Sequence, residues 1–215
     1  MEKESRGEGE ENSTGEMFDP RTSYFLLLLL TWLLSVAKAG RYEYIVENDA
    51  VFDKCPELEN NNGIDDLMDM SGVNFEYFEG KIYVTGNASL VWEGVESTDI
   101  VTGYGELLKF QRGYWQPTPI YMSTKDFCSI QFNKASVWYQ MWTRYIPEDE
   151  RKCINNYGHI YHYENFNVNT VLEFAYNMEG RYKLLARFQA VDPETKEQRP
   201  KEICFQIFGE FVKVK

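Results

Sequence analysis

Carboxylates are plentiful in this chain, but histidines, which are common in acid–base catalysis and metal binding, are few. The only two histidines, His159 and His162, lie three residues apart. On a β-strand this spacing directs the two side chains to opposite faces, so we do not expect them to share a metal ion. The chain also contains no Gly-x-Ser-x-Gly elbow, phosphate-binding loop or His-Glu-x-x-His motif. We therefore predict no metal site, no cofactor and no enzymatic activity.

The four cysteines, Cys55, Cys128, Cys153 and Cys204, suggest disulfide bonds rather than catalysis. Their spacing is not that of a zinc site, and an even number of cysteines is typical of a secreted chain. Four cysteines allow three pairings, and the sequence alone does not choose among them. We favour Cys128–Cys153 across one helix and Cys55–Cys204 between the two ends of the domain. Both pairs together leave no thiol nucleophile.

The N-terminal region predicts an extracellular protein. Residues 1–16 are acidic and lack apolar content, so we expect a disordered extension. An apolar run over Phe25–Ala37 follows Arg21, and Ala37-Lys38-Ala39 supplies small residues for cleavage, so residues 17–39 are typical of a signal peptide. Met17 is an alternative start to Met1. A transmembrane span needs about 20 apolar residues, so we expect no stable membrane anchor.

Charge and glycosylation add two expectations. The 34 acidic residues outnumber the 22 Lys and Arg residues, giving a formal net charge of −12. Such a chain repels phosphate backbones, so nucleic acid is not an expected partner. Asn87-Ala88-Ser89 is a glycosylation sequon, which secretion would make usable.

The segment from Cys128 to Cys153 predicts one aromatic helix. Apolar or small residues recur every three to four positions, including Phe127, Trp138, Trp142 and Tyr145. Asp126 is a suitable N-cap, and Pro147 ends the pattern.

The rest of residues 40–215 alternates with a period of two and predicts a single β domain. Residues 75–78 and 81–84 form one expected hairpin, and residues 172–178 and 182–190 form a second. Two prolines confine residues 114–121 to an edge strand or a rim. Strands at residues 42–46 and 203–207 complete the pattern. We predict a mostly β, two-sheet sandwich with one short aromatic helix.

Aromatic residues make up 16 % of the chain, which is an unusually high proportion. They are either ordinary core or the lining of a pocket for a hydrophobic molecule. Under the second hypothesis the candidate lining residues are Tyr121, Phe127, Trp138, Trp142, Tyr145, Phe174 and Phe188.

Short motifs give the chain a resemblance to a known group. The signal sequence, Phe52-Asp53-Lys54-Cys55-Pro56, Asp126-Phe127-Cys128 and the position of Cys153 are similar to insect chemosensory proteins of the CheA/CheB type. Those proteins resemble the ganglioside activator protein and the ML lipid-recognition superfamily. The similarity covers roughly residues 40–215. It implies a cup-like β-sandwich that admits a lipid, and disulfides at the two pairs favoured above. Only two such pairs are present, fewer than in the ganglioside activator.

Two hypotheses for function follow. In the first, a secreted binding protein carries a lipid, fatty acid or hydrocarbon-type pheromone and presents it to a chemosensory receptor. In the second, the domain is a secreted interaction module with a filled core. A cavity of several hundred Å³ between the sheets would favour the carrier, and a solid core would favour the module.

Overall fold

The computed structural model describes residue 24 and residues 39–47, 51–56, 62–78, 81–167 and 171–215. The chain divides into two units, residues 1–38 and residues 39–215, and every strand belongs to the second. Apart from Tyr24 and Ala39, the expected acidic extension and signal peptide lie outside the described residues.

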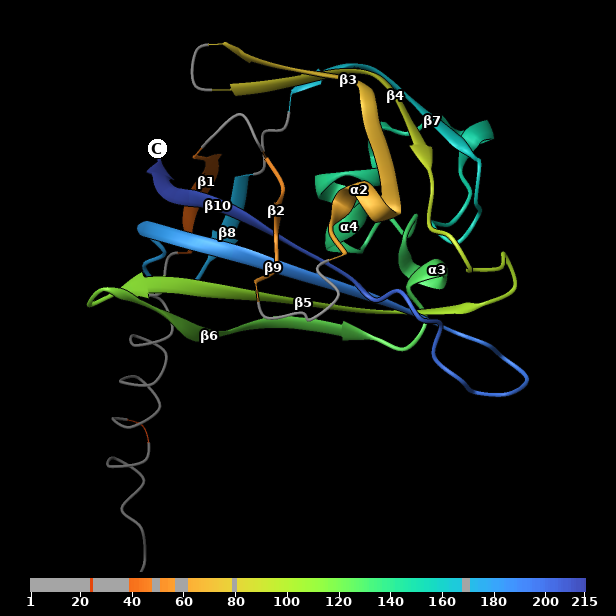
Figure 1. Ribbon diagram of the computed structural model, residues 1–215. Coiled ribbons are helices and arrows are strands. Elements are labelled where there is room, and N and C mark those ends of the chain that lie inside the picture. Colours follow the sequence, from red (N-terminus) through yellow and green to blue (C-terminus); the bar gives the residue numbers. More distant parts are fainter. Residues whose placement is uncertain (1–23, 25–38, 48–50, 57–61, 79–80, 168–170) are drawn as a thin grey trace, which may run out of the picture. The chain divides into compact units, whose positions relative to one another are not determined.

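Two antiparallel sheets make up the β unit, as the sequence predicts (Figure 1). The larger sheet curls into a half-barrel with the strand order β6-β5-β9-β10-β1-β8, and β2 pairs with β10. Its strands are β1 (Gly40–Val46), β2 (Asp53–Lys54), β5 (Ile100–Gln111), β6 (Tyr114–Thr124), β8 (Val171–Phe174), β9 (Gly180–Val191) and β10 (Ile203–Val214). The smaller sheet has the order β3-β4-β7 and consists of β3 (Met68–Phe78), β4 (Lys81–Leu90) and β7 (Ile160–Asn167).

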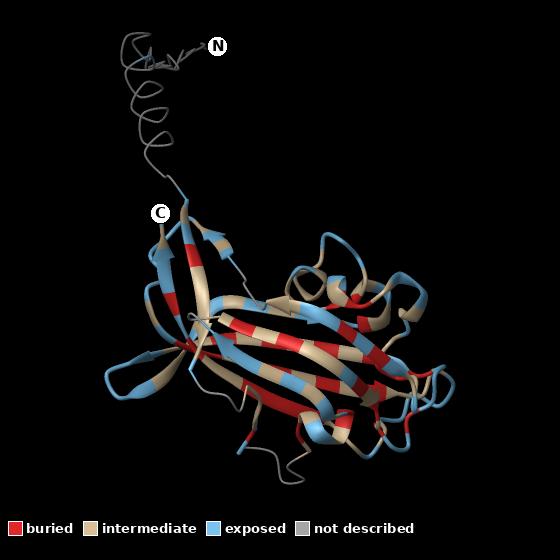
Figure 2. Ribbon diagram, turned by 90° about the horizontal axis from the view of Figure 1, so that it is seen from above, coloured by how far each residue is buried: buried red, intermediate tan, exposed pale blue. Residues whose placement is uncertain are grey.

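The main core lies between the two sheets. Along β5, and along β9 from Ala186 onward, buried residues alternate with more exposed ones, because successive side chains of a strand point to opposite faces (Figure 2). The inward residues of the large sheet, such as Val101 and Phe188, join a buried cluster with Leu90 of β4 and Tyr161 of β7. Burial of this shared apolar surface holds the sheets together.

One of the two predicted hairpins is confirmed and the other is wrong. Strands β3 and β4 pair in register from Gly72↔Asn87 to Phe78↔Lys81. Strand β8, in contrast, pairs with β1 rather than with β9. The alternation of residues 172–190 correctly indicates strand structure, but period two does not identify the partner strand. Strands β10 and β1 lie between β9 and β8 in the sheet.

Strand β6 is an edge of the large sheet, which agrees with the prediction from its prolines. Pro117 lies opposite Leu108, next to a shift in register after Glu106. Proline cannot donate a hydrogen bond to a neighbouring strand, and this position is one of the few in a sheet that tolerates it.

Asn87 lies in the middle strand of the small sheet and is exposed. Its side chain is therefore open to solvent, and the glycan at this residue stays a prediction.

The predicted single helix over residues 127–145 is wrong. The segment instead forms the short helices α3 (Phe127–Ile130) and α4 (Val137–Met141), followed by the 3-10 turns η1 (Thr143–Tyr145) and η2 (Glu148–Glu150). Elsewhere in the chain, a further short helix, α2 (Ile64–Leu67), precedes β3. Asp126 caps α3 as predicted, accepting a hydrogen bond from the Ser129 amide. Asn133 and Ser136 bond to nearby amides, and such local bonds compete with a continuous helix.

Both favoured disulfides are present. Cys55 bonds to Cys204 across 149 residues, and Cys128 bonds to Cys153 across 25 residues. The first joins the start of the unit to β10, and the second joins α3 to the chain leading into β7.

Removing each bridge is expected to lower the free energy of unfolding according to the length of the loop that it closes. Changing Cys55 and Cys204 to Ala together should cost about 5 kcal/mol, and changing Cys128 and Cys153 to Ala about 3.5 kcal/mol. Equilibrium unfolding in urea measures both values. A larger loss for the shorter loop would show that the second bridge acts through native packing instead.

Candidate functional site

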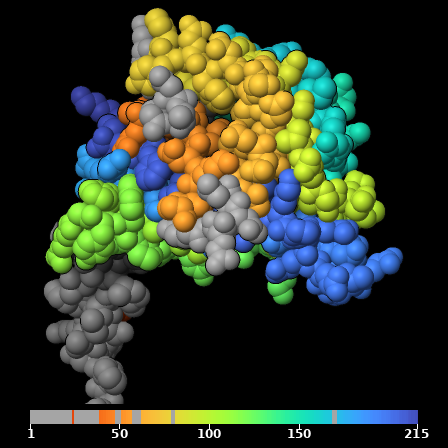
Figure 3. Space-filling view, in the orientation of Figure 1, coloured from red at the N-terminus to blue at the C-terminus, as the bar shows by residue number. Residues whose placement is uncertain are grey.

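An apolar cavity of about 180 Å³ lies in the core between the two sheets. Its described lining comes from β1, α2, β3, β4, α4, β7, β9 and β10 and from the chain around residues 51–52. In the space-filling view, the side chains of α2 and β3 meet those of the segment 51–56 on one face of the unit (Figure 3). The residues of both sheets therefore contribute to one interior space.

Trp138 and Phe188 form an aromatic wall of this cavity. Phe127, which is fully buried, lies against both rings, with ring centroids 5.3 Å from Trp138 and 4.8 Å from Phe188. The tilted and edge-on packing of these rings is a favourable arrangement of aromatic quadrupoles. Phe127 supports the wall but is not part of the lining.

Trp142 and Tyr163 bring polar atoms to the lining. The Trp142 Nε1–H donates a hydrogen bond to the Tyr163 hydroxyl at 2.8 Å. Burial raises the pKa of the Tyr163 hydroxyl to about 12, although the hydrogen bond from Trp142 acts in the opposite direction. The hydroxyl is therefore protonated at physiological pH.

The buried Gln131 side chain links the segment that carries Trp138 and Trp142 to β7. Its Nε2 donates to the Tyr161 hydroxyl at 3.3 Å, and its Oε1 accepts from the Ile154 amide at 3.2 Å. Its backbone carbonyl also accepts from the Thr143 hydroxyl. One residue thus satisfies buried polar groups from three separate parts of the chain.

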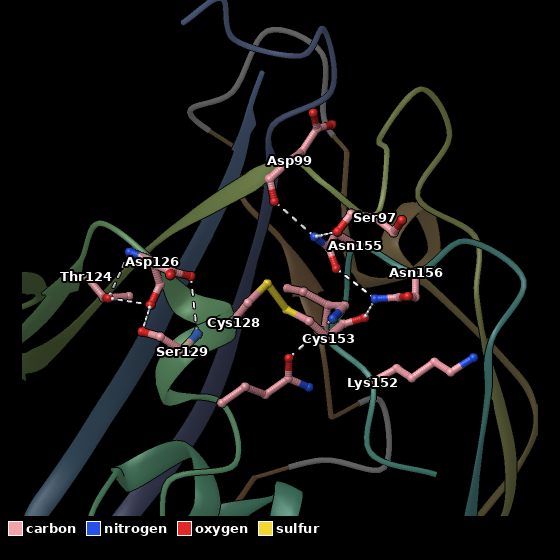
Figure 4. The surroundings of a disulfide bond; sticks show 12 residues. Ser97, Asp99, Thr124, Asp126, Cys128, Ser129, Lys152, Cys153, Asn155 and Asn156 are labelled. Atoms are coloured by element: carbon pink, nitrogen blue, oxygen red, sulfur yellow. Dashed lines mark hydrogen bonds between the residues drawn. A yellow bond between two sulfur atoms is a disulfide. The ribbon is translucent and has the colours of Figure 1, made fainter. Parts of the chain in front are cut away.

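The Cys128–Cys153 bridge adds a covalent link at the same place (Figure 4). Beside it, the Asn155 side chain donates to the backbone carbonyls of Ser97 and Asp99, at 3.0 and 2.9 Å. This bond fixes the loop before β5 to the chain that follows Cys153 (Figure 4). The aromatic wall is therefore held by a disulfide and by buried amide hydrogen bonds.

Of the seven residues predicted to line a pocket, the structure places Trp138, Trp142 and Phe188 in the cavity lining. Phe127 lies directly behind them. Tyr145 stacks on Phe166, with centroids 3.9 Å apart, and it is Phe166 that faces the cavity.

The other two predicted residues lie elsewhere. Tyr121 is 67 % exposed on the edge strand β6. Phe174 belongs to a second core cluster, where it contacts Tyr42 and Phe211. The pairing of β8 with β1 instead of β9 moves Phe174 away from Phe188 and explains this error.

The sequence reasoning missed most of the lining, including Tyr44, Phe52, Tyr163 and Phe205. Alternation along β1, β7 and β10 identifies Tyr44, Tyr163 and Phe205 each as a residue of one face of its own strand, whereas Phe52 lies outside the strands. Which faces meet across the core depends on sheet pairing, which the alternation does not give.

Both histidines contact Glu150, through different groups. His162 Nδ1 lies 2.6 Å from a carboxylate oxygen of Glu150, and His159 Nε2 lies 2.6 Å from the Glu150 backbone carbonyl. His159 precedes β7, so the alternation rule for strands does not apply to it. Both rings secure η2 to the small sheet.

Within the described ranges, no group of three or more His, Cys, Asp or Glu side chains is placed to hold a metal ion. None of the helices described is long and apolar enough to cross a membrane.

The sequence matches no protein-family model and no curated protein.

A larger side chain that points into the cavity should not destabilise the protein, whereas a larger side chain in the packed core should. Val84 is buried and lines the cavity, so Val84→Phe should leave the free energy of unfolding unchanged or raise it by up to about 2 kcal/mol. Val101 is equally buried but belongs to the packed core, so Val101→Phe should cost about 1–3 kcal/mol. Urea unfolding compares the two variants, and equal losses would argue against a usable space beside Val84.

Replacing Gln131 with Leu should destabilise the cavity wall. The change leaves the buried Ile154 amide without its acceptor, which costs about 1–3 kcal/mol. The same substitution at Gln140, which is exposed on α4, should change the free energy of unfolding by less than about 0.5 kcal/mol. Similar effects at the two positions would show that the Gln131 hydrogen bonds contribute little.

Proposed function

We propose that residues 40–215 form a secreted binding protein that carries a small hydrophobic molecule in the cavity between its sheets. The observation that carries this proposal is the cavity itself, which is lined by aromatic, aliphatic and methionine side chains from both sheets. Well-packed cores contain few voids larger than a water molecule, and an apolar void of this size lowers stability unless a ligand fills it.

The volume of the cavity limits the size of the ligand that it can hold. At about 180 Å³ it is smaller than the 300–1,000 Å³ of sites for drug-sized molecules. It is similar to a cavity of about 150 Å³, lined by Leu, Ile and Phe, that stays dry and binds benzene. We therefore favour a compact molecule, or one short arm of a larger one, over a whole glycolipid.

The lining also has the adaptability that a binding site needs. Met68, Met70 and Met141 contribute to it. The unbranched thioether side chain of methionine fills irregular gaps and adjusts to different shapes at little cost.

Two further observations support a role outside the cell. Two disulfides are consistent with an oxidising compartment. The sequence resemblance to CheA/CheB-type chemosensory proteins points to the perception of hydrophobic chemical signals, with delivery to a receptor as the corresponding role.

Benzene is a suitable probe, because its size matches the cavity. Binding to the folded state should raise the free energy of unfolding by about 1.4 kcal/mol at a benzene concentration ten times its Kd. Urea unfolding with and without benzene measures this effect. Val84→Phe should abolish it, whereas Val212→Phe, on an exposed position of β10, should retain it. If benzene stabilises none of the three proteins, the domain acts through its surface as an interaction module.

A further inference from the structure

Some N–H and O–H groups of the lining residues already donate a hydrogen bond within the protein, and others do not. Tyr44 lines the cavity, but its hydroxyl donates to the backbone carbonyl of Ile207 at 2.9 Å. The Trp142 Nε1–H is likewise used, because it donates to Tyr163. These two groups therefore have no proton to offer a ligand.

Tyr163 is different. Its side chain lines the cavity, the residue is only 6 % exposed, and its hydroxyl oxygen accepts the Trp142 hydrogen bond. Among the described residues, no acceptor lies within hydrogen-bonding distance of the Tyr163 hydroxyl proton. A buried donor without an acceptor is costly, and a ligand oxygen would remove that cost.

Trp142 also prepares Tyr163 for this role. A hydroxyl that accepts one hydrogen bond is polarised and becomes a better donor. Tyr163 itself is held in β7, where it lies opposite Gly86 of β4, and its ring packs 5.7 Å from that of Phe166. Both the position and the proton of the hydroxyl are thus fixed before a ligand arrives.

The lining carries no compensating charge. No Asp, Glu, Lys, Arg or His is present among the described residues that line the cavity. An ionised carboxylate transferred into such surroundings would lose its hydration without gaining a cation. The ionised head of a fatty acid is therefore a poor occupant of this space.

Resting on the proposed function, we infer that the ligand is an uncharged molecule with one oxygen acceptor, such as a ketone, aldehyde or alcohol. The Tyr163 hydroxyl donates a hydrogen bond to this oxygen. The hydrocarbon part of the ligand contacts the aromatic and aliphatic lining, and the single oxygen sets its orientation.

Cyclohexanone and methylenecyclohexane test this inference, because they share one shape and differ only in replacing C=O by C=CH₂. Titration calorimetry gives the affinity of each for the wild-type protein and for Tyr163→Phe. Because Tyr163→Phe removes the donor, it should lower the affinity for cyclohexanone about three- to tenfold and leave the affinity for methylenecyclohexane nearly unchanged. The ratio of the two affinities is the readout, because it cancels changes in cavity shape.

Three further variants assign the donor. Tyr44→Phe removes a lining hydroxyl whose proton is already used, so the affinity ratio should stay at its wild-type value. Trp138→Phe removes the other N–H that the lining residues contribute, and it should also leave the ratio unchanged. Trp142→Phe keeps the Tyr163 hydroxyl but removes its polarising hydrogen bond, so it should lower the preference for cyclohexanone without abolishing it, and this test does not depend on the folding of Tyr163→Phe.

The outcomes separate this inference from the proposed function. If both probes bind the wild type and Tyr163→Phe leaves the affinity ratio unchanged, the carrier stands and the role of Tyr163 is overturned. A fall in the ratio in Trp138→Phe instead would likewise overturn the assignment to Tyr163. If neither probe binds the wild type, the proposed function itself fails.

Discussion

The hydrogen bonds of the buried Gln131 amide are the constraint on which the cavity wall depends. Short helices such as α3 and α4 contain too few internal bonds to be stable alone, so tertiary contacts must hold them. Gln131 provides these contacts by bonding to Tyr161, Ile154 and Thr143. The nearby Cys128–Cys153 bridge limits how far the same segment moves if those bonds break.

A rigid wall matters because the space beside it is empty of protein atoms. Side chains around a void tend to collapse into it, and only a firmly held frame preserves the volume. Here the frame is polar and covalent, whereas the surface facing the void is apolar. The hydrogen bonds and the disulfide thus hold the wall in place, whereas lining residues such as Phe188 and Phe205 also belong to the apolar core that joins the sheets.

The sequence predicted the features that depend on local rules. Alternation identified the strands, and Pro117 and Pro119 identified the edge strand. The two disulfides also agree with the favoured pairing, but no local pattern selects that pairing over the other two. The prediction failed where distant segments compete. The apolar spacing of residues 127–145 resembles that of a helix because the residues pack on one core, although local bonds from Asn133 and Ser136 interrupt the backbone. The position of Phe174 depended on strand order, which no local pattern contains.

The prolines of β6 have a consequence for the conditions under which the protein can work. A carrier is used stoichiometrically, because one molecule transports one ligand, so it is useful only when it is abundant. At high concentration an unprotected sheet edge recruits the edges of neighbouring molecules and leads to aggregation. Strand β6 carries Pro117 and Pro119 along such an edge, and proline on an edge strand is one of the features that discourage the addition of a further strand. Under the proposed function, the prolines of this edge therefore favour the high protein concentration that a carrier needs.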